Sequence, residues 1–245
     1  MAADLVKRNV DVILGIGTPA IDAAKRATGS IPIVMALVGD PVASGFVASL
    51  ARPGGNVTGL SLATTDISSK WLELARTVAP GSQIGVLADP NQSTAKQHLK
   101  NIQDAAQWLG VKIQVVYAPA ANDIEGALAS LAREHVTTAI VAPSSLFAFN
   151  AEKIAQSAVK LRIASITTTR DHVEGGALLS YGQDYRAFLR RSTIYIDKIF
   201  KGAKPSDLPV EQPIIFELVI NMATARQLNL AIPKELLLRA DGVVE

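Results

Sequence analysis

Residues 11–20 read DVILGIGTPA, and this stretch sets the pattern that the rest of the chain repeats. Residues 11–17 are predicted to form a strand that is buried on both faces, because the residues after Asp11 are a short, continuous run of apolar residues and glycines. Thr18 can cap a helix and Pro19 suits the first helical position, which predicts a helix over 19–28. A strand that runs through a tight turn into a helix is the start of a βαβ unit.

Apolar runs and helical patterns alternate in this way along most of the sequence. This rhythm predicts an α/β fold with mainly parallel sheets covered on both faces. Further strands are expected at 31–38, 56–61, 84–88, 112–117, 138–142, 165–168, 177–180 and 214–220. Helices are expected at 2–8, 42–50, 66–78, 94–109, 124–134, 151–161 and 184–200.

The pattern restarts after Ser61, which suggests two lobes. We expect the first lobe over 1–61 and the second over 62–182, with a crossover helix and returning segments over 183–245. The first series of strands is shorter than the second. A three-stranded parallel sheet would leave an uncovered edge, so we expect the first lobe to be incomplete and the N-terminus to be truncated.

Composition limits the possible functions. The 245 residues are 49% hydrophobic and 19% charged, with a net charge of +2 and no cysteine. Disulfides, thiolate metal sites and cysteine nucleophiles are therefore excluded. No basic face favours nucleic acid, and no apolar run is long enough to span a bilayer. The N-terminus has no signal-peptide pattern, so the chain as given reads as cytoplasmic or processed.

One motif suggests an enzyme. Gly15, Gly17 and Ala20 match G-x-G-x-x-A between a strand and a helix, and Asp40 follows twenty-odd residues later. This is the fingerprint of a dinucleotide site and supports an NAD(P)-dependent oxidoreductase as the alternative function. However, Gly15 lies inside the predicted strand, Pro41 places Asp40 in an extended turn, and no catalytic partner follows.

The same loop can instead be a ligand-facing strand end. The backbone N–H groups around Gly17, Thr18 and Pro19 could bind a carboxylate or phosphate, or simply cap a helix. Asp40, before Pro41, could pair with an amine or cap the helix expected near Val42. Both interpretations remain open at each position.

Polar residues also end the strands of the second lobe: Asp89, Asn91, Ser144, Ser145 and Arg170. Ligands of open α/β sheets lie at the carboxyl ends of strands, so these residues are candidates for binding a small molecule. Each could also cap a helix. Arg170 could clamp a carboxylate in two-point fashion or form a surface salt bridge.

Among the aromatic residues, Phe147 and Tyr181 lie near strand ends and are candidates for an aromatic wall, with Tyr181 also a candidate hinge residue. The other large aromatic side chains are expected in the core; they are Trp71, Trp108, Tyr117 and Tyr185. The three histidines lack metal-ligand spacing, and no nucleophile elbow or P-loop is present. We therefore expect no catalytic residue, no metal and no cofactor.

Five stretches together form a recognisable set: 40–42, 45–59, 70–74, 175–182 and 216–221. They resemble the substrate-binding proteins of a bacterial ABC transporter family that includes tryptophan- and tyrosine-binding members. The resemblance implies a type I periplasmic binding protein fold with two Rossmann-like lobes, a three-segment hinge and a ligand in the cleft. It also implies delivery to ABC permease subunits and a periplasmic or lipoprotein location. We expect the chain to be a monomer.

This chain departs from the family pattern in the second lobe. Asp89 stands where the family tends to have Asn, and Ser144 and Ser145 lie where it tends to have an acid. The expected function is capture of a small molecule, an amino acid with aromatic ones among the candidates. A further alternative is the ligand-sensing core of a transcription regulator, although no helix-turn-helix precedes the sheet.

Overall fold

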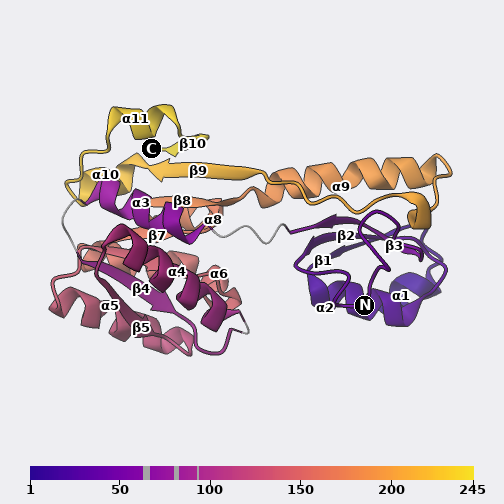
Figure 1. Cartoon of the computed structure of the whole chain (residues 1–245), viewed down its shortest axis with the longest axis horizontal. Helices are drawn as coiled ribbons and strands as arrows, with labels where there is room; N and C mark the ends of the chain where they lie inside the picture. Colours follow the sequence, from indigo (N-terminus) through magenta and orange to yellow (C-terminus); the bar gives the residue numbers. More distant parts are fainter. Residues whose placement is uncertain (63–66, 80–82, 93) are drawn as a thin grey trace. The chain divides into compact units, whose positions relative to one another are not determined.

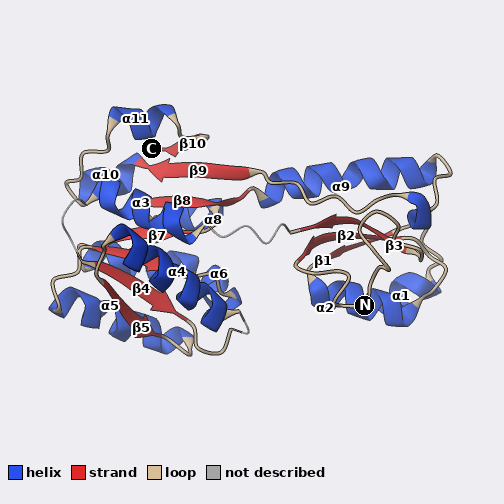
Figure 2. Ribbon diagram, viewed as in Figure 1, coloured by secondary structure: helices blue, strands red, loops and turns tan. Residues whose placement is uncertain are grey.

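The computed structural model describes residues 1–62, 67–79, 83–92 and 94–245, and it has an α/β fold built on parallel sheets (Figures 1 and 2). The chain divides into two compact units. Unit 1 comprises Met1–Thr65 and Asp184–Ile215, and unit 2 comprises Asp66–Gln183 and Phe216–Glu245. By these bounds the chain passes from one unit to the other three times.

Unit 1 contains a parallel sheet in the order β1-β2-β3, with helices on both faces. The α2 side of the sheet packs through Ile21 onto Ile13 and Ile33. On the other face, Phe188 and Tyr195 of α9 pack with residues of β2 and β3. The elements are β1 (Ile13–Ile16), β2 (Ile33–Val38), β3 (Val57–Ser61), α1 (Ala2–Lys7), α2 (Thr18–Ala27), α9 (Tyr185–Phe200) and the short 3₁₀ helix η2 (Pro205–Asp207).

Unit 2 contains a larger sheet whose described strands have the order β10-β9-β8-β7-β6-β4-β5. Neighbouring strands are parallel except β8 and β9, which run antiparallel. The strands are β4 (Ile84–Ala88), β5 (Ile113–Tyr117), β6 (Thr138–Val141), β7 (Ala164–Thr167), β8 (Leu179–Gln183), β9 (Phe216–Asn221) and β10 (Gly242–Val244). The helices are α3 (Ser68–Val78), α4 (Ala95–Leu109), η1 (Ala121–Asp123), α5 (Ile124–Arg133), α6 (Ser145–Phe149), α7 (Ala151–Lys160), α8 (Arg170–Glu174), α10 (Met222–Gln227) and α11 (Lys234–Leu238).

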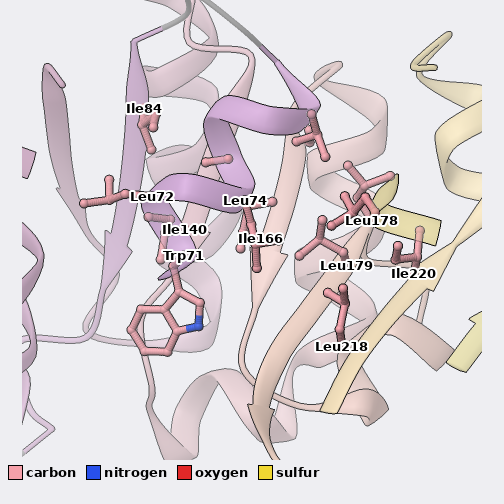
Figure 3. Packing of buried hydrophobic residues seen from close by; sticks show 14 of the residues in the cluster. Trp71, Leu72, Leu74, Ile84, Ile140, Ile166, Leu178, Leu179, Leu218 and Ile220 are labelled. Carbon is pink, nitrogen blue, oxygen red and sulfur yellow. The ribbon is translucent and has the colours of Figure 1, made fainter. Parts of the chain in front are cut away.

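The sheet of unit 2 has a hydrophobic core on each face. Ile84 and Ile140 face the helices α3 and α4 (Figure 3), whereas Leu87 and Val141 face α5 and α7. Helical cover on both faces explains why these strands are continuous apolar runs rather than alternating ones. Trp71 of α3 ties its helix to the sheet, because its Nε1–H donates a hydrogen bond to the Tyr181 carbonyl at 2.7 Å.

None of the described helices combines the length and the apolar character needed to cross a membrane.

The structure corrects several expectations about local structure. The helix predicted over 42–50 is wrong, because this segment forms turns and bends in which Gly45 has a left-handed φ of 68°. The final strand begins at Phe216 rather than at 214, and β10 was not anticipated. The helix predicted after the first strand is confirmed, but Gly17 rather than Thr18 is its N-cap residue, and Pro19 is the second helical residue.

Aromatic burial was predicted correctly for Trp71, which is 3% exposed. It was wrong for Trp108, which is 81% exposed on α4, and for Tyr117 and Tyr185, which are also exposed. The buried face of α4 carries Ile102 and Ala106. Trp108 comes two residues after Ala106, which places it on the opposite side of the helix.

Candidate functional site

The sheet of unit 2 contains a topological switch point between β4 and β6. The strand β4 lies between β5 and β6. The chain continues from β4 onto one face of the sheet and from β6 onto the opposite face. Helix α4, which follows β4, packs with α3, whereas α7, which follows β6, packs with α5. Ligands of open α/β sheets bind in the crevice that such a reversal leaves at the carboxyl ends of the strands.

Asp89 and Ser144 meet at this point. Asp89 follows β4 directly and Ser144 comes three residues after the end of β6, and the Ser144 Oγ–H donates to Asp89 Oδ2 at 2.7 Å. Ser144 is also the N-cap residue of α6, where its Oγ accepts the Leu146 N–H at 3.0 Å. One serine therefore serves both as a helix cap and as a link between two strand ends.

Neighbouring residues extend this hydrogen-bonded group. Asn91 donates its backbone N–H to Asp89 Oδ1 at 2.9 Å and its side-chain amide to the Pro119 carbonyl at 3.1 Å. Ser145 is exposed, and its N–H points to Gln92 Oε1 at 3.5 Å. The structure thus brings together Asp89, Asn91, Ser144 and Ser145. Gln92 was not singled out from the sequence, although its position in the Asp89 loop could have suggested it.

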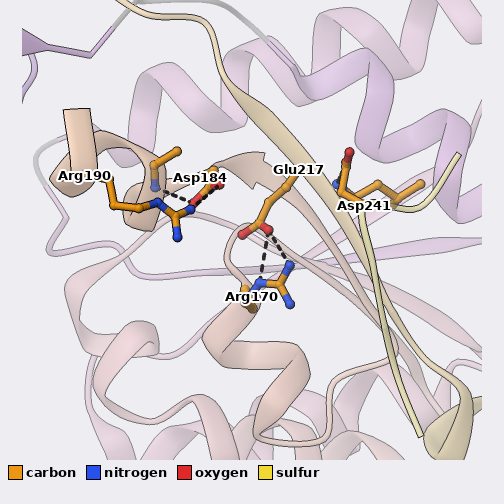
Figure 4. A network of polar contacts seen from close by, with 7 residues as sticks. Arg170, Asp184, Arg190, Glu217 and Asp241 are labelled. Carbon is orange, nitrogen blue, oxygen red and sulfur yellow. Dashed lines mark hydrogen bonds and ion pairs between the residues drawn. The ribbon is translucent and has the colours of Figure 1, made fainter.

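Arg170 has a carboxylate partner within the chain (Figure 4). It is the first residue of α8, and both its Nε–H and its Nη2–H donate to Glu217 Oε2, at 3.1 and 2.8 Å. The guanidinium also lies against Gly242, where a Cβ would come 2.7 Å from Nη2. Arg170 therefore joins α8 to β9 and β10. The acid was missed from the sequence because it lies 47 residues further along the chain.

The aromatic candidates have different surroundings. Phe147 is 1% exposed and packs in the core on the α5 and α7 side, whereas Phe149 on the same short helix is 91% exposed. Tyr181 lies within β8 rather than after it, and its ring stacks on Phe216 of β9 with 5.6 Å between centroids. An aromatic wall at α6 would thus be formed by Phe149 rather than by Phe147.

A buried histidine lies in α8, the short helix that follows β7. His172 of α8 is 4% exposed, and its Nδ1 is 2.7 Å from the Thr169 hydroxyl. Burial lowers the pKa of His172, and the Phe147 backbone and the Asp171 charge offset part of this effect. The folded chain therefore favours the neutral imidazole.

In unit 1 the candidate residues serve the local backbone. Gly17 has a φ of 78° as the N-cap of α2, and Thr18 and Pro19 are exposed in its first turn. Asp40 is exposed and its Oδ1 accepts the N–H groups of Val42 and Ala43, at 3.0 and 2.9 Å. Asp40 thus closes a turn, not the helix expected there. Its neighbour Pro41 is buried, and its carbonyl accepts the Phe46 N–H.

The glycines of the dinucleotide-like motif have a structural explanation. Gly15 lies inside β1, and a Cβ there would come 2.4 Å from Cδ1 of Ile21 on α2. Gly17 supplies the positive φ of the turn. The pair thus permits close packing of a helix on a strand, which needs no bound cofactor.

Comparison with known proteins identifies the family. Residues 1–244 match the model of the ABC transporter substrate binding protein family. A tyrosine-binding protein of Clostridioides difficile (strain R20291) is 29% identical over 233 residues, which make up 94% of this chain and 66% of that protein. The chain therefore spans just under two thirds of the length of this curated relative.

Solved structures show the same fold over the whole chain. An ABC domain from Streptococcus pneumonia in complex with L-Trp is 27% identical, with a TM-score of 0.80 and coverage of 100% of this chain and 82% of that one. A conserved domain protein from Vibrio cholerae is 31% identical, with a TM-score of 0.79 and coverage of 99% and 81%. These comparisons give no support to the oxidoreductase alternative. The fold is that of the type I periplasmic binding proteins, and the chain belongs to the ABC transporter substrate binding protein family.

Proposed function

We propose that this protein is the solute-binding component of an ABC import system and that it captures a free amino acid, with aromatic amino acids as the first candidates. The observation that carries the proposal is the polar group at the switch point, where Asp89 and Ser144 join the ends of β4 and β6. The relatives that bind tyrosine and L-Trp support the choice of ligand. Membership of the family supports the further proposals of delivery to permease subunits and an extracytoplasmic location.

The chemistry of this group suits an amino acid. A carboxylate can accept hydrogen bonds from an ammonium group, while hydroxyl and backbone N–H groups at strand ends can donate to a carboxylate. Asp89 supplies the first feature, and exposed Ser145 at the start of α6 supplies the second. Exposed Phe149 offers an apolar surface for an aromatic side chain. Capture of this kind makes and breaks no covalent bond.

Thermal unfolding in the presence of each of the twenty amino acids tests capture. A ligand that binds only the folded chain at 100 times its dissociation constant adds about 2.7 kcal/mol. For a chain of this size that corresponds to a rise of roughly 5–10 °C in the unfolding midpoint. We expect one or a few amino acids to give such a shift. If none of the twenty changes the midpoint at millimolar concentration, amino-acid capture is wrong.

Uptake in cells tests delivery. Deleting the coding region should reduce uptake of the radiolabelled amino acid identified in the thermal screen, and the wild-type gene should restore it. Uptake of an amino acid that does not shift the midpoint is the control and should not change. Unchanged uptake of both would contradict the transport role while leaving the binding result intact.

A further inference from the structure

The starting observation is a buried negative charge. Asp89 is only 6% exposed, yet no ion pair is formed with it among the described residues. Its two oxygens accept hydrogen bonds from neutral donors alone, the Asn91 N–H and the Ser144 Oγ–H. Buried carboxylates are normally paired with a cation, because losing the solvation of a charge is costly.

The local structure does not require this charge. An asparagine at position 89 could accept the Asn91 N–H through its carbonyl oxygen and donate its amide to Ser144 Oγ. The turn before α4 and the link between β4 and β6 would both be kept. A carboxylate therefore adds something that an amide does not, which is a negative charge at the switch point.

The one cation among the candidate residues of unit 2 does not supply the missing partner. Arg170, the cation among the candidate residues of unit 2, already donates two hydrogen bonds to Glu217. Glu217 balances that charge, so the candidate residues and Glu217 together carry an excess of one negative charge. A carboxylate has about four lone-pair sites, of which two are occupied at Asp89.

We propose that Asp89 binds a protonated amine of the ligand and selects for molecules that carry one. The ligand class is a primary ammonium compound, and a free amino acid is the member required by the proposed function, on which this inference rests. The ammonium group would donate hydrogen bonds to the remaining lone pairs of Asp89, at the carboxyl ends of β4 and β6. Ligands with a carboxylate but no amine would lack this partner.

Binding of matched compounds to the purified chain tests the proposal by calorimetry. The probes are the amino acids that pass the thermal screen together with phenylalanine, tyrosine and tryptophan, the corresponding amines without a carboxylate, and the corresponding propanoic acids without an amine. We expect the amine-containing compounds to bind and the propanoic acids to bind at least about tenfold more weakly. Asp89→Asn should weaken binding of amine-containing compounds about tenfold or more and leave the propanoic acids unchanged.

The matched control is Asp184→Asn, which makes the same change at a carboxylate that accepts a backbone N–H, from Ala187 at 2.8 Å, in unit 1. It should leave affinity unchanged. The unfolding midpoint without ligand should be equal or higher in Asp89→Asn, because the change removes an unpaired buried charge. A lower midpoint with unchanged affinity would show that Asp89 is structural and overturn the proposal.

The outcomes also separate this inference from the proposed function. Amino acids that bind wild type and Asp89→Asn equally would refute the role of Asp89 and leave amino-acid capture standing. Amines that bind through Asp89 while amino acids do not would refute amino-acid capture and support the amine site. If no probe binds the wild-type chain, both are wrong.

Discussion

Replacing Trp71 with phenylalanine tests the packing of α3 on the sheet of unit 2. The change removes the Nε1–H that donates to the part-buried Tyr181 carbonyl, at a cost of about 1–3 kcal/mol. The ring atoms lost from a site that is 3% exposed are equivalent to roughly two methylene groups, or about 1.5 kcal/mol. Together these effects predict a destabilisation of about 3 kcal/mol.

The matched control is Trp108→Phe, because Trp108 is 81% exposed and should change stability by no more than about 0.5 kcal/mol. Both tryptophans of the sequence lie in unit 2, so their fluorescence reports that unit, with circular dichroism as the second probe. With a urea m-value of about 2 kcal/mol/M, Trp71→Phe should lower the unfolding midpoint by about 1.5 M. A midpoint no lower than that of Trp108→Phe would refute the reasoning.

Three further predictions concern backbone space, an ion pair and pH. Gly59→Ala should destabilise unit 1 by about 3 kcal/mol or more, because Gly59 has a φ of 128° and a Cβ there would lie 2.3 Å from the Met35 carbonyl oxygen. A normal circular dichroism spectrum and an unchanged urea midpoint would contradict this prediction. Glu217→Gln should lower the free energy of unfolding by about 2 kcal/mol, because it leaves Arg170 without its charge partner. Adding Arg170→Met to that variant should restore part of the lost stability. If the losses of the two single variants simply add in this double-mutant cycle, the two residues are not a coupled pair. Burial lowers the pKa of His172 below its ordinary 6.5, so between the folded and the unfolded pKa the unfolded chain binds more protons than the folded chain. The free energy of unfolding should therefore fall as pH decreases below about 6.5 and level off below the folded pKa. The decline in urea midpoint from pH 7.5 to 5.5 should be smaller in His172→Gln, and an identical decline would exclude this cause.

The sequence was sufficient to predict burial on both faces for β4, but the same expectation is wrong for β1, where Leu14 and Ile16 are 41% and 51% exposed. The run from Ile84 to Ala88 is apolar throughout, because side chains on each face meet a layer of helices. Its short length and the turn residues around it distinguish it from a helix. The strand β10 was not predicted because it has only three residues. Its position depends on a hydrogen bond between residues far apart in the sequence, from the Asp241 N–H to the Leu218 carbonyl.

Helical periodicity was misleading where local backbone geometry opposed it. The segment 42–50 has apolar residues at helical spacing, but Gly45 adopts a left-handed conformation and Asp40 closes a turn with its side chain. Trp108 illustrates the opposite problem, because the helix predicted around it is correct but the expectation that its side chain is buried is wrong. The spacing of Ile102 and Ala106 would have placed Trp108 toward solvent.

The residue types of the candidate site could be predicted from the sequence, but which of these residues lie together could not. Asp89 and Ser144 are 55 residues apart, and nothing in the sequence states that β6 rather than β5 lies beside β4 on that side. Likewise, Arg170 could be named as a carboxylate clamp, but only the antiparallel β8–β9 pairing brings Glu217 to it. Strand order is a long-range property, and hydrophobic patterns carry little information about it.

The glycine motif and the switch point show why local similarity and site geometry can disagree. Gly15 and Gly17 match the dinucleotide pattern for structural reasons. Gly15 lets α2 pack closely on β1, and Gly17 supplies the positive φ at the start of that helix. Any βα unit with close packing can produce that pattern without a ligand. The Asp89–Ser144 link is less easily explained by packing, since it places a buried charge at the switch point between the parallel strands β4 and β6. An unpaired charge lowers stability unless a ligand uses it, and for this reason the amine-binding test at Asp89 discriminates between structure and function better than the motif does.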